Sequence, residues 1–204
     1  TDYIDLYQSH WTDDDTPIEE SLRAYDDLVR QGKVRHIGAS NYAAWELMQA
    51  LWTLDKFNLA RYDSLQPHYN LIERDEFERE LRAVCLAHEI AVIPYSPLAG
   101  GFLTGKYRRD QPAPESKRAK GLKHAATEKN FALLDKMDEI AAAHNATVAQ
   151  IALAWMLADP AITSPIIGAT SIEQLNENLG ALDVKLSAEE MDVLNKMTEW
   201  KKEE

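Results

Sequence analysis

The feature that most constrains this chain is a motif that recurs four times: a run of β-type residues that ends in polar or glycine-rich residues. The four copies lie at 4–10, 37–41, 65–70 and 95–101. Each copy but the last precedes a stretch with helical periodicity, so the pattern predicts strand, loop and helix in repetition. Ligand-binding groups of parallel α/β folds lie beyond the carboxyl ends of the strands. The polar residues that end the four runs are therefore the first candidates for a functional site.

Short runs rich in Ile, Val, Leu or Tyr predict five strands, at about 3–8, 34–39, 62–66, 90–95 and 164–168. Helix starts are expected where a side-chain oxygen can cap free backbone donors. These starts are Thr16 before Pro17, Thr147 with Gln150, Ser171 with Gln174, and Ser187 with Glu190. Gly32 favours the end of the first helix. Pro160 is expected to end a later helix, the one that carries Leu153 and Leu157.

Alternating strands and helices build either an open doubly wound sheet or a closed barrel, and the alternation alone does not choose between them. A Gly-x-Gly-x-x-Gly fingerprint after the first strand is missing, which weakens the open-sheet interpretation. A complete eight-stranded barrel generally needs about 250 residues, whereas this chain has 204. Five strands fit part of a barrel better than a whole one. The chain starts at Thr1 and enters a strand at once, so we expect it to be cut from a longer barrel.

Composition narrows the class of protein. The chain can bury a core, and we predict one domain over residues 1–204 with no internal boundary. Its net charge of −12 argues against broad binding to nucleic acid or to an anionic membrane. The first residues do not resemble a signal peptide. Cys85 is the only cysteine, which excludes an intramolecular disulfide and suits a cytoplasmic location. The histidines show no metal-ligand spacing, so no metal site is expected.

One segment interrupts the alternation. Residues 108–123 contain Pro112, Pro114 and many basic residues, with almost no large apolar side chain. Two interpretations stay open for this loop. It is either a solvated connection or a lid over a phosphate-bearing ligand, because loops of this length are usually functional or disordered.

The order and spacing of the motifs resemble those of the aldo-keto reductase superfamily, and more closely the branch with bacterial reductases and potassium-channel β subunits. The resemblance runs from 2–10 through 33–41 to 168–178. It implies a (β/α)8 TIM barrel, of which this chain holds the fourth strand onward and an extra C-terminal helix at about 188–198. It also implies an NADP-dependent carbonyl reductase, in which a nicotinamide delivers hydride and a tyrosine, helped by a lysine and an aspartate, donates the proton. Those three residues are expected upstream of the segment.

The resemblance assigns roles around the reacting end of the cofactor. His10 matches the histidine that hydrogen-bonds the substrate carbonyl, and Trp11 beside it is expected to border the substrate pocket. The nicotinamide carboxamide, which carries donors and an acceptor, is held in the family by residues that match Ser40, Asn41 and Gln66. Tyr95 matches the aromatic residue that stacks on the nicotinamide ring.

The resemblance also assigns the rest of the cofactor site. Ser96, Leu98 and Gly100 match a turn that wraps the pyrophosphate, and Lys106 and Arg118 match basic contacts of a cofactor clamp. The adenosine end is matched by Gly168, Thr170, Gln174, Glu177 and Asn178. Many family members have a basic residue near position 170 for the 2′-phosphate of NADP, where this chain has Thr170. We expect NADP, with NAD as the alternative.

Structural interpretations stand beside these roles. His10 and Tyr95, taken alone, would more often be structural residues at strand ends, and Lys106 and Arg118 could be a solvated loop face. The pair Ser40-Asn41 could cap a helix. Two functions stay open. The first is a carbonyl reductase of small molecules, of which this chain is expected to be only a part; the second is a non-catalytic nucleotide-binding or regulatory protein of the same fold. With open strand edges, the isolated chain is expected to self-associate or to pair with a complementing N-terminal segment, and to be poorly active.

Overall fold

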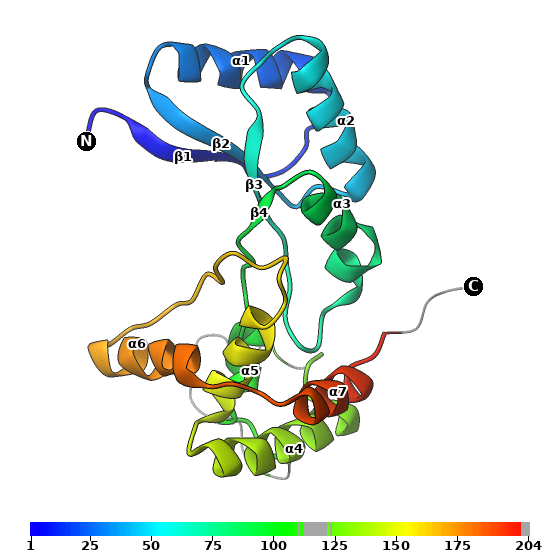
Figure 1. The fold of residues 1–204 in the computed structure, drawn as a ribbon, viewed down its shortest axis with the longest axis vertical. Helices are drawn as coiled ribbons and strands as arrows, with labels where there is room; N and C mark the ends of the chain where they lie inside the picture. Colours follow the sequence, from blue (N-terminus) through cyan, green and yellow to red (C-terminus); the bar gives the residue numbers. More distant parts are fainter. Residues whose placement is uncertain (110, 112–121, 123, 201–204) are drawn as a thin grey trace. The chain divides into compact units, whose positions relative to one another are not determined.

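A computed structural model of the chain describes residues 1–109, 111, 122 and 124–200. The chain divides into two compact units (Figure 1). The sheet unit consists of Thr1–Pro67 and Glu76–Ile93, and the helical unit consists of His68–Asp75 and Pro94–Glu204. That the whole chain forms one domain stays a prediction.

The sheet unit is a four-stranded parallel sheet with helices between its strands. The strands are β1 (Ile4–Ser9), β2 (Val34–Ser40), β3 (Tyr62–Gln66) and β4 (Ala91–Val92), in the spatial order β1-β2-β3-β4. The helices are α1 (Ile18–Arg30), α2 (Ala44–Lys56), and α3 (Arg82–Ala87), which continues a π-helical turn, η1 (Phe77–Leu81). Sequential parallel pairing through helical crossovers is the arrangement that the alternation predicts. The first three predicted strands are confirmed.

The core of the sheet unit consists of apolar side chains from the strands and from the helices between them. Leu22 of α1, Leu47 of α2 and Leu65 of β3 are fully buried. Leu47, Ala50, Leu51 and Leu54 recur at helical spacing in α2, so one face of this helix is apolar. Tyr62 is also fully buried at the start of β3. The apolar faces anchor the strands, and with them the loops at the carboxyl ends of the strands.

The helical unit contains α4 (Glu128–His144), α5 (Val148–Leu157), α6 (Ile172–Leu179) and α7 (Ala188–Met197), with the 3-10 segments η2 (Ala99–Thr104) and η4 (Gly180–Asp183). Helix α5 is apolar and buried on nearly every side, which is typical of a central core helix. Helix α7 confirms the extra helix expected at 188–198. Phe102 of η2 is fully buried and contacts the ring of Phe131 in α4.

Two strand predictions need correction. The predicted strand at 164–168 is wrong: the segment has no strand pairing, and Ile166 donates one hydrogen bond to the Pro94 carbonyl over 2.8 Å. Pro165 lacks a backbone donor, which prevents a regular ladder there. The predicted strand at 90–95 is reduced to β4, since Pro94 interrupts its hydrogen bonding as well.

The helix-start predictions hold in three places and fail in one. Thr147, Ser171 and Ser187 each accept a hydrogen bond from the backbone N–H three residues on. The prediction for Thr16 is wrong, because its hydroxyl donates to Asp13 Oδ2 over 2.8 Å and caps no helix donor. The N-cap position is taken by Pro17, one residue later than predicted, and Pro17 has no side-chain acceptor.

Among the described residues, no single helix has both the length and the apolar character to cross a membrane. Helices α4 and α5 meet these two criteria only as a pair, and a bend of 89° separates them.

Candidate functional site

The carboxyl ends of β1, β2 and β3 bring four of the predicted residues together. Ser40 Oγ donates to the Gln66 carbonyl over 2.8 Å. Asn41 Nδ2 donates to the His10 carbonyl over 3.0 Å and to Ser40 Oγ over 3.1 Å. The parallel register pairs Ser40 with Gln66, so these residues end their strands at one edge of the sheet. Asn41 has a φ of +56°, a left-handed conformation that asparagine tolerates.

The side chains at this edge differ in exposure. Ser40 is buried, Asn41 and Gln66 are half-buried, and His10 is exposed. The His10 ring lies against Trp11, with ring centroids 5.7 Å apart. The arrangement offers a hydroxyl, two amides and an imidazole to a ligand over the strand ends, a set that can both donate and accept hydrogen bonds.

A buried hydroxyl chain supports the loop that carries His10. Ser9 Oγ donates to the Trp11 carbonyl over 3.2 Å and lies 3.0 Å from Tyr42 Oη, which lies 3.2 Å from Tyr62 Oη. Each hydroxyl has one hydrogen, so Tyr42 must donate to Ser9, and Tyr62 to Tyr42. Burial, above all, raises the pKa of Tyr62 far above its usual range, which keeps this hydroxyl neutral. Sequence reasoning missed this chain, because its members are 20 or more residues apart.

A polar layer lies just before the carboxyl ends of the strands, where Gln8 of β1, Gly38 of β2 and Ser64 of β3 are in register. Gln66 Nε2 donates to Gln8 Oε1 over 3.1 Å. Within the described part of the chain, the buried Gln8 Nε2 and Ser64 Oγ have no hydrogen-bond partner. A Cβ at Gly38 would lie 2.3 Å from Ser64 Oγ, so this site requires glycine for the close approach.

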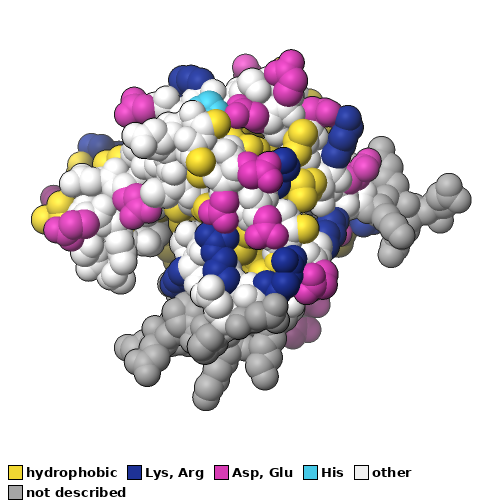
Figure 2. Space-filling view, turned by 90° about the horizontal axis from the view of Figure 1, so that it is seen from below, with side chains coloured by type: hydrophobic (Ala, Val, Ile, Leu, Met, Phe, Trp, Pro, Cys, Tyr) yellow, Lys and Arg dark blue, Asp and Glu magenta, His cyan; other side chains and the backbone are white. Residues whose placement is uncertain are grey.

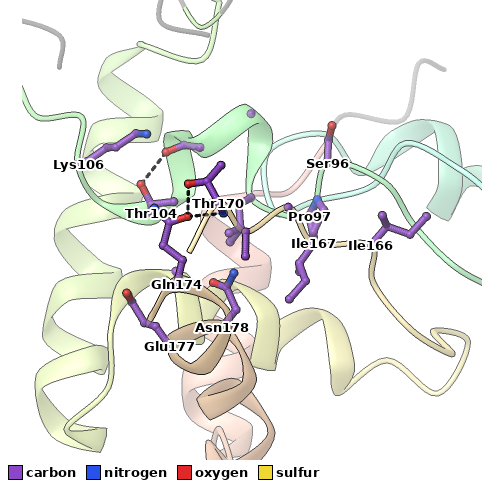
Figure 3. A pocket seen from close by; sticks show the side chains of 16 residues that line it. Ser96, Pro97, Thr104, Lys106, Ile166, Ile167, Thr170, Gln174, Glu177 and Asn178 are labelled. Atoms are coloured by element: carbon purple, nitrogen blue, oxygen red, sulfur yellow. Dashed lines mark hydrogen bonds between the residues drawn. The ribbon is translucent and has the colours of Figure 1, made fainter. Parts of the chain in front are cut away.

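The helical unit contains a cavity of about 730 Å³ (Figure 3). Nine of the predicted cofactor residues line it: Ser96, Leu98, Gly100, Lys106, Gly168, Thr170, Gln174, Glu177 and Asn178. The structure thus brings together residues that the sequence separates by up to 82 positions, from Ser96 to Asn178. Arg118, also predicted for the cofactor, lies outside the described residues.

One wall of the cavity is a turn with an unusual backbone. Ser96, Ala99, Gly100 and Gly101 have positive φ angles of 55°, 47°, 63° and 105°. The Leu98 carbonyl accepts hydrogen bonds from the backbone N–H groups of Gly101 and Leu103, which closes the turn. Leu98, with a φ of −103°, is followed by Ala99 in the left-handed region. A change of this kind between successive residues can gather backbone N–H groups on one side, where they attract anions. Non-glycine residues in this region are strained, and such strain gathers at functional sites.

The opposite wall belongs to the start of α6. Thr170 donates to Gln174 Oε1 through both its backbone N–H and its hydroxyl, each over 2.9 Å. Ser171 Oγ accepts from the Gln174 backbone and caps the helix. Figure 3 shows the side chains of Gln174, Glu177 and Asn178 rising from this helix below Thr170 and Thr104. Hydrogen-bonding groups and one carboxylate therefore line this end, with Lys106 as a cation in the lining.

A second cluster in the helical unit joins Tyr95, a predicted cofactor residue, to residues that were not predicted as functional. The His68 ring stacks on Tyr95, with centroids 4.9 Å apart and planes 11° apart. His68 Nε2 lies 3.0 Å from Glu73 Oε2, and the hydrogen bond from His68 is the largest influence that lowers the pKa of Glu73 to about 2. Asn70 also donates to Glu73. The only sequence signal for His68 and Asn70 was their place in the third motif, 65–70, and Glu73 lies outside the four motifs.

The start of the basic loop makes ion pairs with α4. Arg108 donates to both carboxylate oxygens of Asp138, over 2.6 and 3.0 Å, and Arg109 Nε donates to Glu128 over 3.1 Å. These two side chains are engaged in structural contacts, while most of the rest of the loop lies outside the described residues. In the ranges that the structure describes, no group of three or more His, Cys, Asp or Glu side chains is arranged to hold a metal ion.

Comparison with known proteins assigns the class. The aldo/keto reductase family matches residues 1–199, and the chain belongs to this family. Its fold is the aldo-keto reductase fold, which is a TIM barrel, and four parallel strands of it are described here. A crystal structure of the thermostable aldo-keto reductase Tm1743, with the inhibitor epalrestat, matches with a TM-score of 0.75 and 33% identity, over 97% of this chain and 61% of that one.

Among curated relatives, the uncharacterized oxidoreductase YrpG of Bacillus subtilis is 35% identical over 96% of this chain and 58% of its own length. Versiconal hemiacetal acetate reductase of Aspergillus parasiticus is 35% identical over 94% and 56%. A probable voltage-gated potassium channel subunit beta of Arabidopsis thaliana is 34% identical over 90% and 57%. The chain spans a little over half the length of these relatives.

Proposed function

We propose that this chain is the cofactor-binding part of an NADPH-dependent reductase that converts small aldehydes or ketones to alcohols. The observation that carries this proposal is the cavity of the helical unit, where nine residues at family cofactor positions line one space. Family membership supports the oxidoreductase class. The cavity volume of about 730 Å³ suits a ligand of dinucleotide size.

The residues present fit a dinucleotide. In the turn from Ser96 to Gly101, two backbone N–H groups donate to carbonyls of the turn itself, and those of Leu98 and Gly100 would meet a pyrophosphate. Lys106 adds a positive charge in the lining of the same cavity. Asn178 offers amide donors and an acceptor at the adenosine end, where Thr170, whose two donors are held by Gln174, offers an acceptor oxygen. When bound, the reduced nicotinamide supplies a hydride for the carbonyl carbon of the substrate.

Residues at the strand ends would act at the reacting end. Ser40, Asn41 and Gln66 provide the donors and acceptors that a carboxamide needs. For Tyr95, in the helical unit, the role that the family suggests is to cover one face of the nicotinamide ring. His10 is exposed at the end of β1 and can donate a hydrogen bond from a ring nitrogen to a substrate carbonyl oxygen. Trp11, 62% exposed, would form an apolar wall beside the substrate.

We propose that the barrel is completed by a segment upstream, which would supply the proton-donor tyrosine with its lysine and aspartate. Two apolar surfaces support this. Strand β1 lies at the edge of the sheet, with Ile4 and Leu6 46% and 36% exposed. On α6, Ile172, Leu175 and Leu179 are exposed at helical spacing. Unpaired edges and apolar faces of this kind are normally covered.

We propose NADP rather than NAD as the cofactor, and a cytoplasmic location. Thr170 carries no charge, and its hydroxyl is engaged with Gln174. The 2′-phosphate would therefore be held by Ser171 and Lys106, with Arg118 as a further basic contact. On the face drawn in Figure 2, basic and acidic side chains are intermixed.

A second candidate function is a non-catalytic nucleotide-binding or regulatory role in the same fold. It is favoured by the potassium channel subunits among the relatives. Such a protein would bind the dinucleotide and have no carbonyl turnover.

The test measures both binding and turnover on the protein that carries this chain, purified from its natural source. NADPH and NADH are titrated by fluorescence, and oxidation of the tighter ligand is followed with a panel of aldehydes. Turnover supports the reductase, and binding without turnover supports the regulatory role. Failure to bind either dinucleotide rules out both.

A further inference from the structure

Asn70 is a fully buried asparagine whose amide makes four hydrogen bonds. Nδ2 donates to Glu73 Oε2 over 2.9 Å and to the Ser96 carbonyl over 3.2 Å. Oδ1 accepts from the backbone N–H groups of Ile72 and Glu73 over 3.0 and 3.1 Å. A flipped amide would place its hydrogens against two N–H donors, so the orientation is fixed by its partners. No donor of the side chain is left over for another role.

The contact with Ser96 reaches the wall of the cavity. The Ser96 carbonyl also accepts from the Ala99 backbone N–H over 2.9 Å, so it is held from two sides. Ser96 and Ala99 both have left-handed φ angles, of 55° and 47°. Such a conformation persists where surrounding contacts over-determine it. Asn70 supplies one of these contacts from outside the turn.

The segment that carries Asn70 is itself fixed within the helical unit. Tyr69 packs against the ring of Trp155, with centroids 5.5 Å apart. Arg74 Nη1 donates to Thr198 Oγ1 over 2.7 Å. Asn70 and Glu73 also exchange two backbone hydrogen bonds of 3.2 Å each. The amide of Asn70 is therefore presented to Ser96 from a rigid support.

We propose that Asn70 is a positioning residue for the dinucleotide: by holding the Ser96 carbonyl, its amide keeps the turn from Ser96 to Gly101 preformed for the pyrophosphate. Asn70 is absent from the lining of the cavity and acts through Ser96. The inference rests on the proposed function. A flexible turn would lose conformational entropy when it binds the ligand, and this loss would weaken binding. A preformed turn has already been ordered by folding, so it binds more tightly.

The test replaces the donor and keeps the shape. Asn70→Asp removes both Nδ2 donors, and Asn70→Asp with Glu73→Gln does the same without placing two carboxylates side by side. We expect exchange of the Ala99 amide hydrogen, followed by NMR, to accelerate at least about tenfold in both variants. The Kd for NADPH should rise about tenfold in both. Glu73→Gln alone retains an acceptor for Asn70 and should change either quantity less than about twofold.

Ser187→Ala is the matched control, because it removes a helix cap on α7 far in sequence from the turn. It should lower stability without changing the Kd for NADPH. If Asn70→Asp does not fold by circular dichroism, Asn70→Ser, which keeps one donor, takes its place with the same expected direction. Unchanged exchange at Ala99, or an unchanged Kd, overturns the proposal, as does recovery of both in the double variant, which would assign the effect to charge repulsion. Failure of the unaltered protein to bind NADPH or NADH would instead refute the proposed function.

Discussion

The two units present their candidate ligand groups in different ways. In the sheet unit the groups are side chains at strand ends, such as Ser40 and Gln66, and the parallel register places them side by side. In the helical unit, side chains of α6 are joined by backbone groups of one turn, whose left-handed residues need support from elsewhere in the chain. A substitution in the sheet unit should therefore act directly on a ligand. In the helical unit, a distant residue can matter as much as a neighbour.

The largest expected effect separates the two cores. Phe102→Ala in the helical unit should lower the free energy of unfolding by about 4 kcal/mol, and Leu65→Ala in the sheet unit by about 3 kcal/mol, because both side chains are fully buried. Urea unfolding followed by far-UV circular dichroism measures both. If the units unfold independently, each variant shifts one of two transitions. A single shared transition would show that the units are thermodynamically one domain.

The next effect concerns catalysis at the strand ends. His10→Gln, in the protein that carries this chain, should lower kcat/KM for aldehydes by about 10²-fold, because the amide is a poor substitute for the imidazole at the substrate oxygen. The Kd for NADPH should stay within about twofold, since His10 is predicted to touch substrate only. A parallel loss of cofactor affinity would contradict the division of roles between side chains in the sheet unit.

A third effect tests how closely the strands approach. Gly38→Ala should lower the free energy of unfolding by about 2 kcal/mol, because the new Cβ would lie 2.3 Å from Ser64 Oγ. Gly168→Ala is the control, since nothing lies within 4 Å of its added Cβ. Thermal unfolding measures both variants. Equal melting temperatures would show that the sheet relaxes at Gly38 and that its register is less fixed than the hydrogen bonds indicate.

A smaller effect distinguishes two helix starts. Thr147→Ala should destabilise the helical unit by about 1 kcal/mol, because Thr147 and Gln150 form a reciprocal capping box. Thr16→Ala in the sheet unit should cost only a few tenths of a kcal/mol, because its hydroxyl caps no helix. The measurement is the urea midpoint of each variant. Similar losses at both sites would restore Thr16 as a cap in solution.

The smallest effect depends on pH. The folded pKa of Glu73 is lowered to about 2, from an ordinary value of 4.5. Its contribution to stability is therefore present above about pH 4.5 and is lost as the pH falls toward 2. Glu73→Gln should cost about 0.5–1 kcal/mol at pH 7, allowing for solvent screening of this partly exposed carboxylate. The difference from the unaltered protein should vanish near pH 2 in urea titrations. A difference that is independent of pH would indicate a packing effect instead.

These contrasts also explain what the sequence could predict. The strands ending at Ser9, Ser40 and Gln66 follow from local β-type runs, and the caps at Thr147 and Ser187 from local polar spacing. The strand predicted at 164–168 rested on its apolar residues, but Pro165 in the same run lacks a backbone donor, a signal against a strand that the sequence itself carries. The residues of the cavity were found through family resemblance, since side chains 82 positions apart leave no local signal.

The support behind the site was beyond such reasoning. Asn70 was visible only as a member of the third motif, and its bond to Ser96 depends on tertiary packing. No motif in the sequence marks Tyr42 or Tyr62, yet their hydroxyls orient Ser9 and the loop after β1. Buried polar groups whose partners are distant in sequence are the part of a site that periodicity and motif spacing do not predict.

Cys85, the only thiol of the chain, is 1% exposed, and burial raises its pKa to about 12. At neutral pH only about one molecule in 10⁵ carries the thiolate that reacts with alkylating agents. An alkylating agent therefore reacts with Cys85 only in molecules in which α3 has opened. The rate at which an iodoacetamide probe accumulates on the folded protein thus records the opening of the sheet unit, with no engineered label and no second thiol to confuse the time course.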